Sequence, residues 1–194
     1  MAVEFRRLIA AFGIRSCIET GTWSGGTTRT LRSMVLGRMT TLDTTTEHLL
    51  EDHGPGAVQE LEAMGITLVL GNSKDTLAGV LAGYGDADFP VLCYLDAHGQ
   101  GNPIREELAA IAGEPRCRDT SIIIIHDCLN PYRAFGYNWV DWGEGVGAEP
   151  LSYACLQHLV PAIFPGGHQV HYNDEAEGCM RGVCYVTPTR GNVT

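Results

Sequence analysis

The sequence of 194 residues is poor in basic residues, and it has no long apolar run and no paired-cysteine motif. It holds 13 lysines and arginines against 23 aspartates and glutamates, which gives a formal net charge of -10. This balance argues against nucleic acid as the main partner, because binding to phosphates requires a basic face. The longest apolar runs, at 89–95 and 121–125, are strand-sized and fall well short of the roughly 20 residues that cross a membrane. We therefore expect neither nucleic acid nor a membrane as a partner.

The cysteines and the N-terminus lack two further signals. The seven cysteines have no Cys-x-x-Cys spacing, so the sequence indicates neither a disulfide framework nor a zinc cluster. The charged residues Glu4, Arg6 and Arg7 precede only a short apolar stretch at 8–14, which is typical of an amphipathic helix rather than a secretory signal. We expect a cytoplasmic protein by default. The length and the 44% hydrophobic content predict one domain over residues 1–194.

Short apolar runs alternate with longer amphipathic stretches along most of the chain, which predicts βαβ units and a parallel sheet. Strands are expected at 16–19, 39–43, 66–70, 91–96 and 121–126, and helices at 27–36, 47–64, 74–82, 103–112 and 150–160. Ser73 and Asn102 are candidate helix caps. Two final strands, at 169–172 and 183–186, are expected to pair with each other. The predicted fold is α/β: a Rossmann-like, doubly wound, mostly parallel sheet with an antiparallel C-terminal hairpin.

Ligands of such a sheet collect beyond the carboxyl ends of the strands, where the strand order reverses. The segment from Glu19 to Thr28, Glu-Thr-Gly-Thr-Trp-Ser-Gly-Gly-Thr-Thr, leaves a strand and opens a helix, so its glycines let a cofactor approach the backbone. Trp23 stands where a dinucleotide fingerprint needs its second glycine, which argues against NAD and FAD. Thr27 stands where a phosphate-binding P-loop needs lysine, which argues against nucleoside triphosphates. What remains is a cofactor with a ribose and an adenine but no phosphates. Asp43 ends the next strand at close to the spacing of about 20 residues at which an acid meets ribose hydroxyls.

With these residues the chain resembles the class I S-adenosylmethionine-dependent methyltransferases over residues 16–127. The pattern Glu19-x-Gly21-x-x-x-Gly25-x-Thr27 resembles their first motif, and Asp43 resembles their ribose acid. The turn that begins Gly71-Asn-Ser73 resembles the one that touches adenine in the catechol O-methyltransferase branch.

This resemblance implies a place for each part of the cofactor. Gly21 and Thr22 would face the methionine moiety, with Thr27 near its carboxylate, and Ser73 would touch adenine. The alternative is that Glu19 caps the helix or pairs with a neighbour and that the glycines only make a turn.

Asp96 and Asp127 end adjacent predicted strands, so their carboxylates are expected to converge, and two carboxylates with waters suit Mg²⁺. The metal-dependent O-methyltransferases that the chain resembles, of the catechol, macrocin and cephalosporin-hydroxylase-like types, place metal carboxylates at these strand ends. Catechol-type enzymes have asparagine where this chain has Cys128, and macrocin-type enzymes have an acid where it has His126. His126 as a third ligand would make a softer site, more tolerant of Mn²⁺, Fe²⁺ or Zn²⁺. The alternative is that Asp96 serves the cofactor or substrate and that Asp127 caps a loop.

His98 is the candidate catalytic base, because an imidazole with an ordinary pKa of about 6.5 can take a proton from a substrate hydroxyl at neutral pH. Catechol-type enzymes use a lysine downstream of this strand, which the chain lacks, whereas macrocin-type enzymes have a histidine just after the aspartate. The alternative is that His98 stacks on adenine or bonds a carboxylate. We expect surface or packing roles for the remaining histidines outside the strand ends, His48, His53, His158, His168 and His171.

Aromatic residues gather between 132 and 142, directly after Asp127, which predicts a lid or substrate loop at 129–149. The alternative for this stretch is a homodimer contact. The leading hypothesis for the protein is transfer of the methyl group of S-adenosylmethionine to a small-molecule hydroxyl, assisted by Mg²⁺ or another divalent cation. Two alternatives stay open: a non-methylating enzyme that uses the same cofactor for cyclisation or elimination, and a non-catalytic binding module on the same fold.

Overall fold

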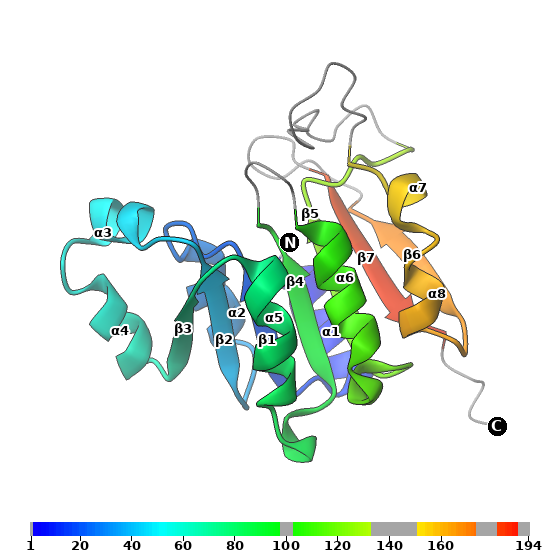
Figure 1. The fold of residues 1–194 in the computed structure, drawn as a ribbon, viewed down its shortest axis with the longest axis horizontal. Coiled ribbons are helices and arrows are strands. Elements are labelled where there is room, and N and C mark those ends of the chain that lie inside the picture. The colour runs from blue at the N-terminus through cyan, green and yellow to red at the C-terminus, as the bar shows by residue number, and fades with distance from the viewer. Residues whose placement is uncertain (1, 98–102, 133–150, 174–181, 190–194) are drawn as a thin grey trace.

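The computed structural model describes residues 2–97, 103–132, 151–173 and 182–189, and these form one seven-stranded sheet with helices on both faces (Figure 1). The strand order is β3-β2-β1-β4-β5-β7-β6. The strands are β1 (Ser16–Thr20), β2 (Met39–Asp43), β3 (Ile66–Leu70), β4 (Val91–Leu95), β5 (Ile122–His126), β6 (His168–Tyr172) and β7 (Val183–Pro188). Strands β1 to β5 are parallel, and β7 pairs antiparallel with both β5 and β6. The predicted fold class is confirmed, with the refinement that β7 lies between β5 and β6.

The side chains of the central strands alternate between two apolar layers, as a strand period of two requires. In β5, Ile122 and Ile124 face one layer, and Ile123 and Ile125 face the other. All four are fully buried, because helices cover both faces of a parallel sheet.

The helices divide between these two faces (Figure 1). Helices α5 (Ser73–Ala82), α6 (Ile104–Gly113), α7 (Tyr153–Leu156) and α8 (Val160–Ile163) contribute to one apolar layer. Helices α1 (Ala2–Phe12), α2 (Gly26–Arg32), α3 (Glu47–His53) and α4 (Ala57–Ala63) contribute to the other. Two single 3₁₀ turns lie at Asp86–Asp88 and Pro115–Cys117. Among the described residues no helix is long and apolar enough to cross a membrane.

The predicted helix at 47–64 is wrong in its continuity, because the chain breaks into α3 and α4. Gly54 ends α3 with a φ of 81°, and Pro55 follows it, so the helical hydrogen-bond ladder cannot continue. The predicted helix at 150–160 is likewise two short helices, and Pro161 lies in the first turn of the second. The helix expected at 27–36 ends at Arg32, and α1 begins before the apolar stretch at 8–14.

The cap of α5 also differs from the expectation. Asn72, rather than Ser73, is the N-cap, and its side-chain oxygen accepts a hydrogen bond from the backbone N–H of Lys74. The second candidate cap, Asn102, lies outside the described residues.

Candidate active site

The site is centred where the strand order reverses, between β1 and β4. Both neighbours of β1 are parallel to it, so the carboxyl ends of β1, β2 and β4 share one edge of the sheet. The backbone N–H of Asp96 donates to the carbonyl of Thr20 at 3.0 Å, which holds the end of β4 against the start of the glycine turn. Gly21 has a φ of 84°, and a Cβ there would lie 2.7 Å from the carbonyl carbon of Asp96. Only glycine allows this approach of the two backbones.

Asp43, at the end of β2, holds the glycine turn from the other side. Its Oδ2 accepts a hydrogen bond from the backbone N–H of Trp23 at 2.8 Å, and its Oδ1 accepts one from the N–H of Thr45 at 3.3 Å. Each carboxylate oxygen keeps further acceptor capacity, so the same group can also bind a ligand hydroxyl. The turn then enters α2 through Gly25, which has a φ of 76°.

Glu19, the last-but-one residue of β1, lies fully buried beneath the turn. Its Oε2 accepts hydrogen bonds from the hydroxyl groups of Thr28 and of Thr41, the latter at 2.7 Å. Within the described part of the chain, its Oε1 has no hydrogen-bond partner. Burial raises the pKa of Glu19 to about 8, although the two threonine hydrogen bonds oppose that shift. A neutral carboxyl group therefore lies under the turn at neutral pH, with one oxygen unsatisfied.

Ser73 opens α5 at the carboxyl end of β3. Its side chain is buried, and among the described residues its Oγ has no hydrogen-bond partner. Its neighbour Asn72 takes up the capping role, so the Ser73 hydroxyl is not used as the cap of α5.

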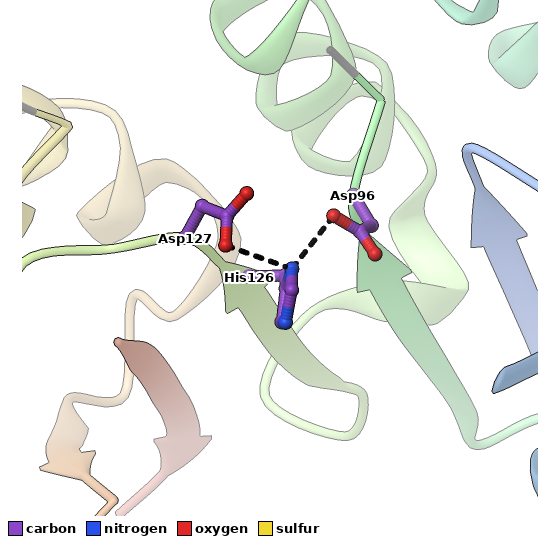
Figure 2. A group of neighbouring side chains, drawn as sticks. All are labelled: Asp96, His126 and Asp127. Atoms are coloured by element: carbon purple, nitrogen blue, oxygen red, sulfur yellow. Dashed lines mark hydrogen bonds and ion pairs between the residues drawn. The ribbon is translucent and has the colours of Figure 1, made fainter. Parts of the chain in front are cut away.

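Asp96, His126 and Asp127 converge at the ends of β4 and β5 (Figure 2). His126 Nδ1 lies 2.8 Å from Asp96 Oδ1 and 3.2 Å from Asp127 Oδ1. One ligand atom from each of the three residues lies within 4.8 Å of the others. Asp127 and His126 are buried, and Asp96 is partly buried.

The backbone of Asp127 explains how two consecutive residues reach the same point. Neighbouring side chains of a strand point to opposite faces, so His126 and Asp127 would diverge if β5 continued. Asp127 instead has a φ of 56°, in the left-handed region that non-glycine residues seldom adopt. This turn ends the strand and brings the Asp127 carboxylate back toward the imidazole of His126 (Figure 2).

Most of the residues that the sequence singled out lie around this edge. Thr22 is buried, and its hydroxyl lies 2.6 Å from that of Thr41. Thr27 is half-buried in the first turn of α2. His98 and residues 133–149 of the expected loop lie outside the described residues, so the assignments of the base and the lid stay predictions.

Sequence reasoning missed several residues of the site. Thr28 and Thr41 hold the Glu19 carboxyl, and Tyr94 donates from its hydroxyl to Asp96 Oδ2 at 3.4 Å. A signal for Thr28 existed, because it follows Thr27 in the same motif, whereas Thr41 and Tyr94 act across neighbouring strands. His48, expected to be a surface or packing residue, stacks on Trp23 in the glycine turn.

No protein-family model and no curated protein matches this sequence. Solved structures do match over nearly its whole length. The O-methyltransferase TomG from Streptomyces achromogenes, involved in tomaymycin synthesis and solved with S-adenosylmethionine, has a TM-score of 0.61 and 13% identity, over 97% of this chain and 79% of that one. An O-methyltransferase from Bacillus cereus in complex with S-adenosylhomocysteine has a TM-score of 0.59 and 16% identity, over 96% and 80%. An rRNA methylase from Streptococcus thermophilus has a TM-score of 0.58 and 10% identity, over 97% and 95%.

At these identities the comparison shows a shared fold. This fold is that of the S-adenosylmethionine-dependent methyltransferases, which confirms the fold that the sequence resemblance implied. The neighbours include proteins described as acting on different acceptors, so the fold by itself does not choose the acceptor of this chain.

Proposed function

We propose that the protein transfers the methyl group of S-adenosylmethionine to a hydroxyl group of a small molecule, with a divalent cation held at Asp96, His126 and Asp127. The observation that carries this proposal is the place of that cluster. It lies at the carboxyl end of β4, the strand whose end contacts the glycine turn of β1. A cofactor in the turn and a cation at the cluster would therefore be neighbours.

The cofactor fits the side of the site formed by β1, β2 and β3. Asp43 retains acceptor capacity for the two ribose hydroxyls while it holds the turn. Ser73 Oγ is buried and has no partner in the described part of the chain, and in this proposal it would contact adenine. Glu19 Oε1 is a second such atom, beneath the glycine turn. Buried polar atoms without partners are uncommon in native proteins, and a bound polar ligand would satisfy both of these.

The cation fits the distances within the cluster. Two ligands at right angles, each about 2.1 Å from a divalent ion, are about 3.0 Å apart. The observed separations of 2.8 and 3.2 Å around His126 Nδ1 are close to that value, and a cation would replace the hydrogen bond between Nδ1 and Asp96 Oδ1. One nitrogen and two carboxylates suit Mn²⁺, Fe²⁺ or Zn²⁺ better than a set of oxygen ligands alone would. The hydroxyl of Tyr94 donates a hydrogen bond to Asp96 and so helps to orient its carboxylate.

The reaction requires little from the protein beyond placement and one proton transfer. The acceptor oxygen would form a bond to the methyl carbon as the carbon–sulfur bond breaks, which leaves S-adenosylhomocysteine. His98, two residues after Asp96, is the proposed base that takes the hydroxyl proton. A bound cation would make that hydroxyl more acidic. The positive charge of the cofactor sulfonium and the negative charge of the deprotonated acceptor oxygen cancel in the transfer. Alignment of the two reacting groups in a site without water therefore supplies most of the rate acceleration.

A small-molecule acceptor is favoured by the charge of the chain. The net charge of -10 disfavours approach to a phosphate backbone, and Asp96 and Asp127 add negative charge where the acceptor would lie. A cation at the cluster would offset that local charge for a hydroxylated molecule.

The test is methyl transfer to a panel of hydroxylated small molecules, followed by product mass spectrometry. Protein stripped with EDTA would be assayed alone and after addition of Mg²⁺, Mn²⁺, Fe²⁺ or Zn²⁺. We expect products that carry one additional methyl group, activity that is lost on stripping, and restoration by at least one cation. Activity that survives EDTA would contradict the role of the cation. Consumption of the cofactor without methylated product would point to a different reaction.

The Asp127→Asn variant distinguishes the role of the cation from binding of the cofactor. This variant should lower cation-dependent turnover by at least about 100-fold, because a neutral amide binds a divalent cation more weakly than a carboxylate does. Its affinity for S-adenosylhomocysteine should stay within about twofold of the parent value, since no cofactor contact is assigned to Asp127. Equal losses in turnover and affinity would place this side chain in the cofactor pocket instead.

A further inference from the structure

Trp23 occupies a backbone position that disfavours it. Its φ is 48°, in the left-handed region, where a bulky non-glycine residue is strained. Glycine would adopt the same conformation without that cost, and glycines already stand at positions 21, 25 and 26 of the same turn. A tryptophan at such a position costs free energy that glycine would not cost.

Packing within the protein supplies little compensation for that cost. The residue is 63% exposed, whereas most aromatic residues of a folded domain bury far more of their area. Its indole stacks on His48, with ring centroids 3.5 Å apart and planes inclined by 25°. His48 is itself 39% exposed and pairs with the exposed Glu51 at 3.4 Å. Such a stack at the rim stabilises the fold only slightly.

The stack lies next to the segments that flank Asp43, the residue assigned to the ribose. The backbone N–H of Trp23 donates to the carboxylate of Asp43, and His48 belongs to α3, the helix that follows Asp43 in the chain. The stack therefore joins the glycine turn to the segment after β2, and these two segments border Asp43. A nucleoside bound through Asp43 would meet the indole at this border.

We propose that Trp23 is a nucleoside-contacting residue, whose indole packs against the adenosine portion of bound S-adenosylmethionine, with His48 supporting the ring from behind. This inference rests on the proposed cofactor. Indole offers a flat, polarisable face to the sugar and base, and stacking of this kind contributes substantially to the binding of nucleosides. Loss of solvent exposure on binding would compensate for the strained backbone.

The experiment compares Trp23→Gly, Trp23→Ala and Trp23→Phe with the parent protein. The two readouts are the dissociation constant for S-adenosylhomocysteine, measured by calorimetry, and the melting temperature without ligand. Leu36→Ala, at a side chain that is 99% exposed, serves as a surface control. The same titrations with 5′-methylthioadenosine, which has no amino-acid moiety, separate contact with the nucleoside from contact with the methionine part.

We expect the glycine and alanine variants to bind both ligands about tenfold more weakly than the parent, and the phenylalanine variant to recover most of the affinity. Trp23→Gly should melt no lower than Trp23→Ala, because glycine relieves the left-handed strain and alanine keeps it. His48→Ala should weaken binding in the parent but not in Trp23→Ala, because its support acts through the indole.

Three results would overturn the inference. Unchanged affinity in all three variants would show that the indole does not touch the ligand. A loss confined to Trp23→Gly would assign the effect to backbone freedom, and a loss confined to S-adenosylhomocysteine would move the contact to the amino-acid moiety. If the parent protein binds neither ligand, the proposed cofactor fails together with this inference, whereas parent binding with unaffected variants refutes the inference alone.

Discussion

Replacing Glu19 with glutamine tests the electrostatics beneath the glycine turn. Glutamine has nearly the same shape, is neutral at every pH, and can accept the hydrogen bonds of Thr28 and Thr41. In the parent protein, burial raises the pKa of Glu19 from its ordinary value of 4.5 to about 8. Between these two pH values the folded protein keeps a proton that the unfolded chain releases.

The direction and size of the effect follow from that difference. Because the folded state binds more protons, the free energy of unfolding falls as the pH rises from 4.5 to about 8. At about 1.4 kcal/mol for each pKa unit, the full shift corresponds to up to about 5 kcal/mol. Below pH 4.5 the carboxyl is neutral in both states, so this penalty vanishes, and above about pH 8 it is complete. Glu19→Gln should therefore match the parent at low pH and become the more stable protein as the pH rises.

Urea denaturation at several pH values from about 5 to about 8 measures this difference directly. Glu62→Gln, at an exposed glutamate of the same chain, controls for the loss of one carboxylate. A stability difference between Glu19→Gln and the parent that stays constant across this range would refute the account of Glu19 as a neutral buried acid. A variant that becomes less stable than the parent at high pH would show that the threonine hydrogen bonds outweigh burial.

Three further substitutions probe the turn, the ribose site and the base. Gly21→Ala should lower the free energy of unfolding, measured by urea denaturation, by about 2–4 kcal/mol. The reason is that Gly21 has a positive φ and that a Cβ there would meet the carbonyl of Asp96. A smaller loss would contradict the close approach of the two strands. Asp43→Ala should weaken the binding of S-adenosylhomocysteine by about 1.5–3 kcal/mol in calorimetry, and an unchanged dissociation constant would remove the ribose from this position. His98→Ala should lower turnover by roughly 10²–10⁴, with a smaller loss at high pH; poor cofactor binding without rescue by alkali would assign His98 to the adenine pocket.

The strands were predictable because their signal is local. Each central strand is a short apolar run bounded by turn residues, and the predicted ends of β2 and β3 coincide with the observed ones. The preference for right-handed βαβ connections leaves few strand orders for such a chain, and the observed order is one of them. The break between α3 and α4 had its own local signal, Gly54-Pro55-Gly56, and the amphipathic pattern across it concealed the break.

Only those residues of the site that stand at strand ends could be predicted from the sequence. Asp96 and Asp127 could be placed together because parallel strands end at a common edge, and the structure brings His126 between them. The contacts of Glu19 with Thr28 and Thr41 join β1, α2 and β2, and no spacing in the sequence encodes them. The left-handed backbone of Asp127 was hidden for the same reason, because it depends on how β5 ends against its neighbours.

Calorimetric titration of the parent protein with S-adenosylhomocysteine tests the central claim most directly, because every functional assignment depends on a cofactor at the glycine turn. We expect saturable binding with one molecule per chain. We also expect a negative change in heat capacity on binding, since apolar surface around the turn would be covered. Absence of binding, in the presence or absence of divalent cations, would contradict the account and leave the methyltransferase fold of this chain without its cofactor.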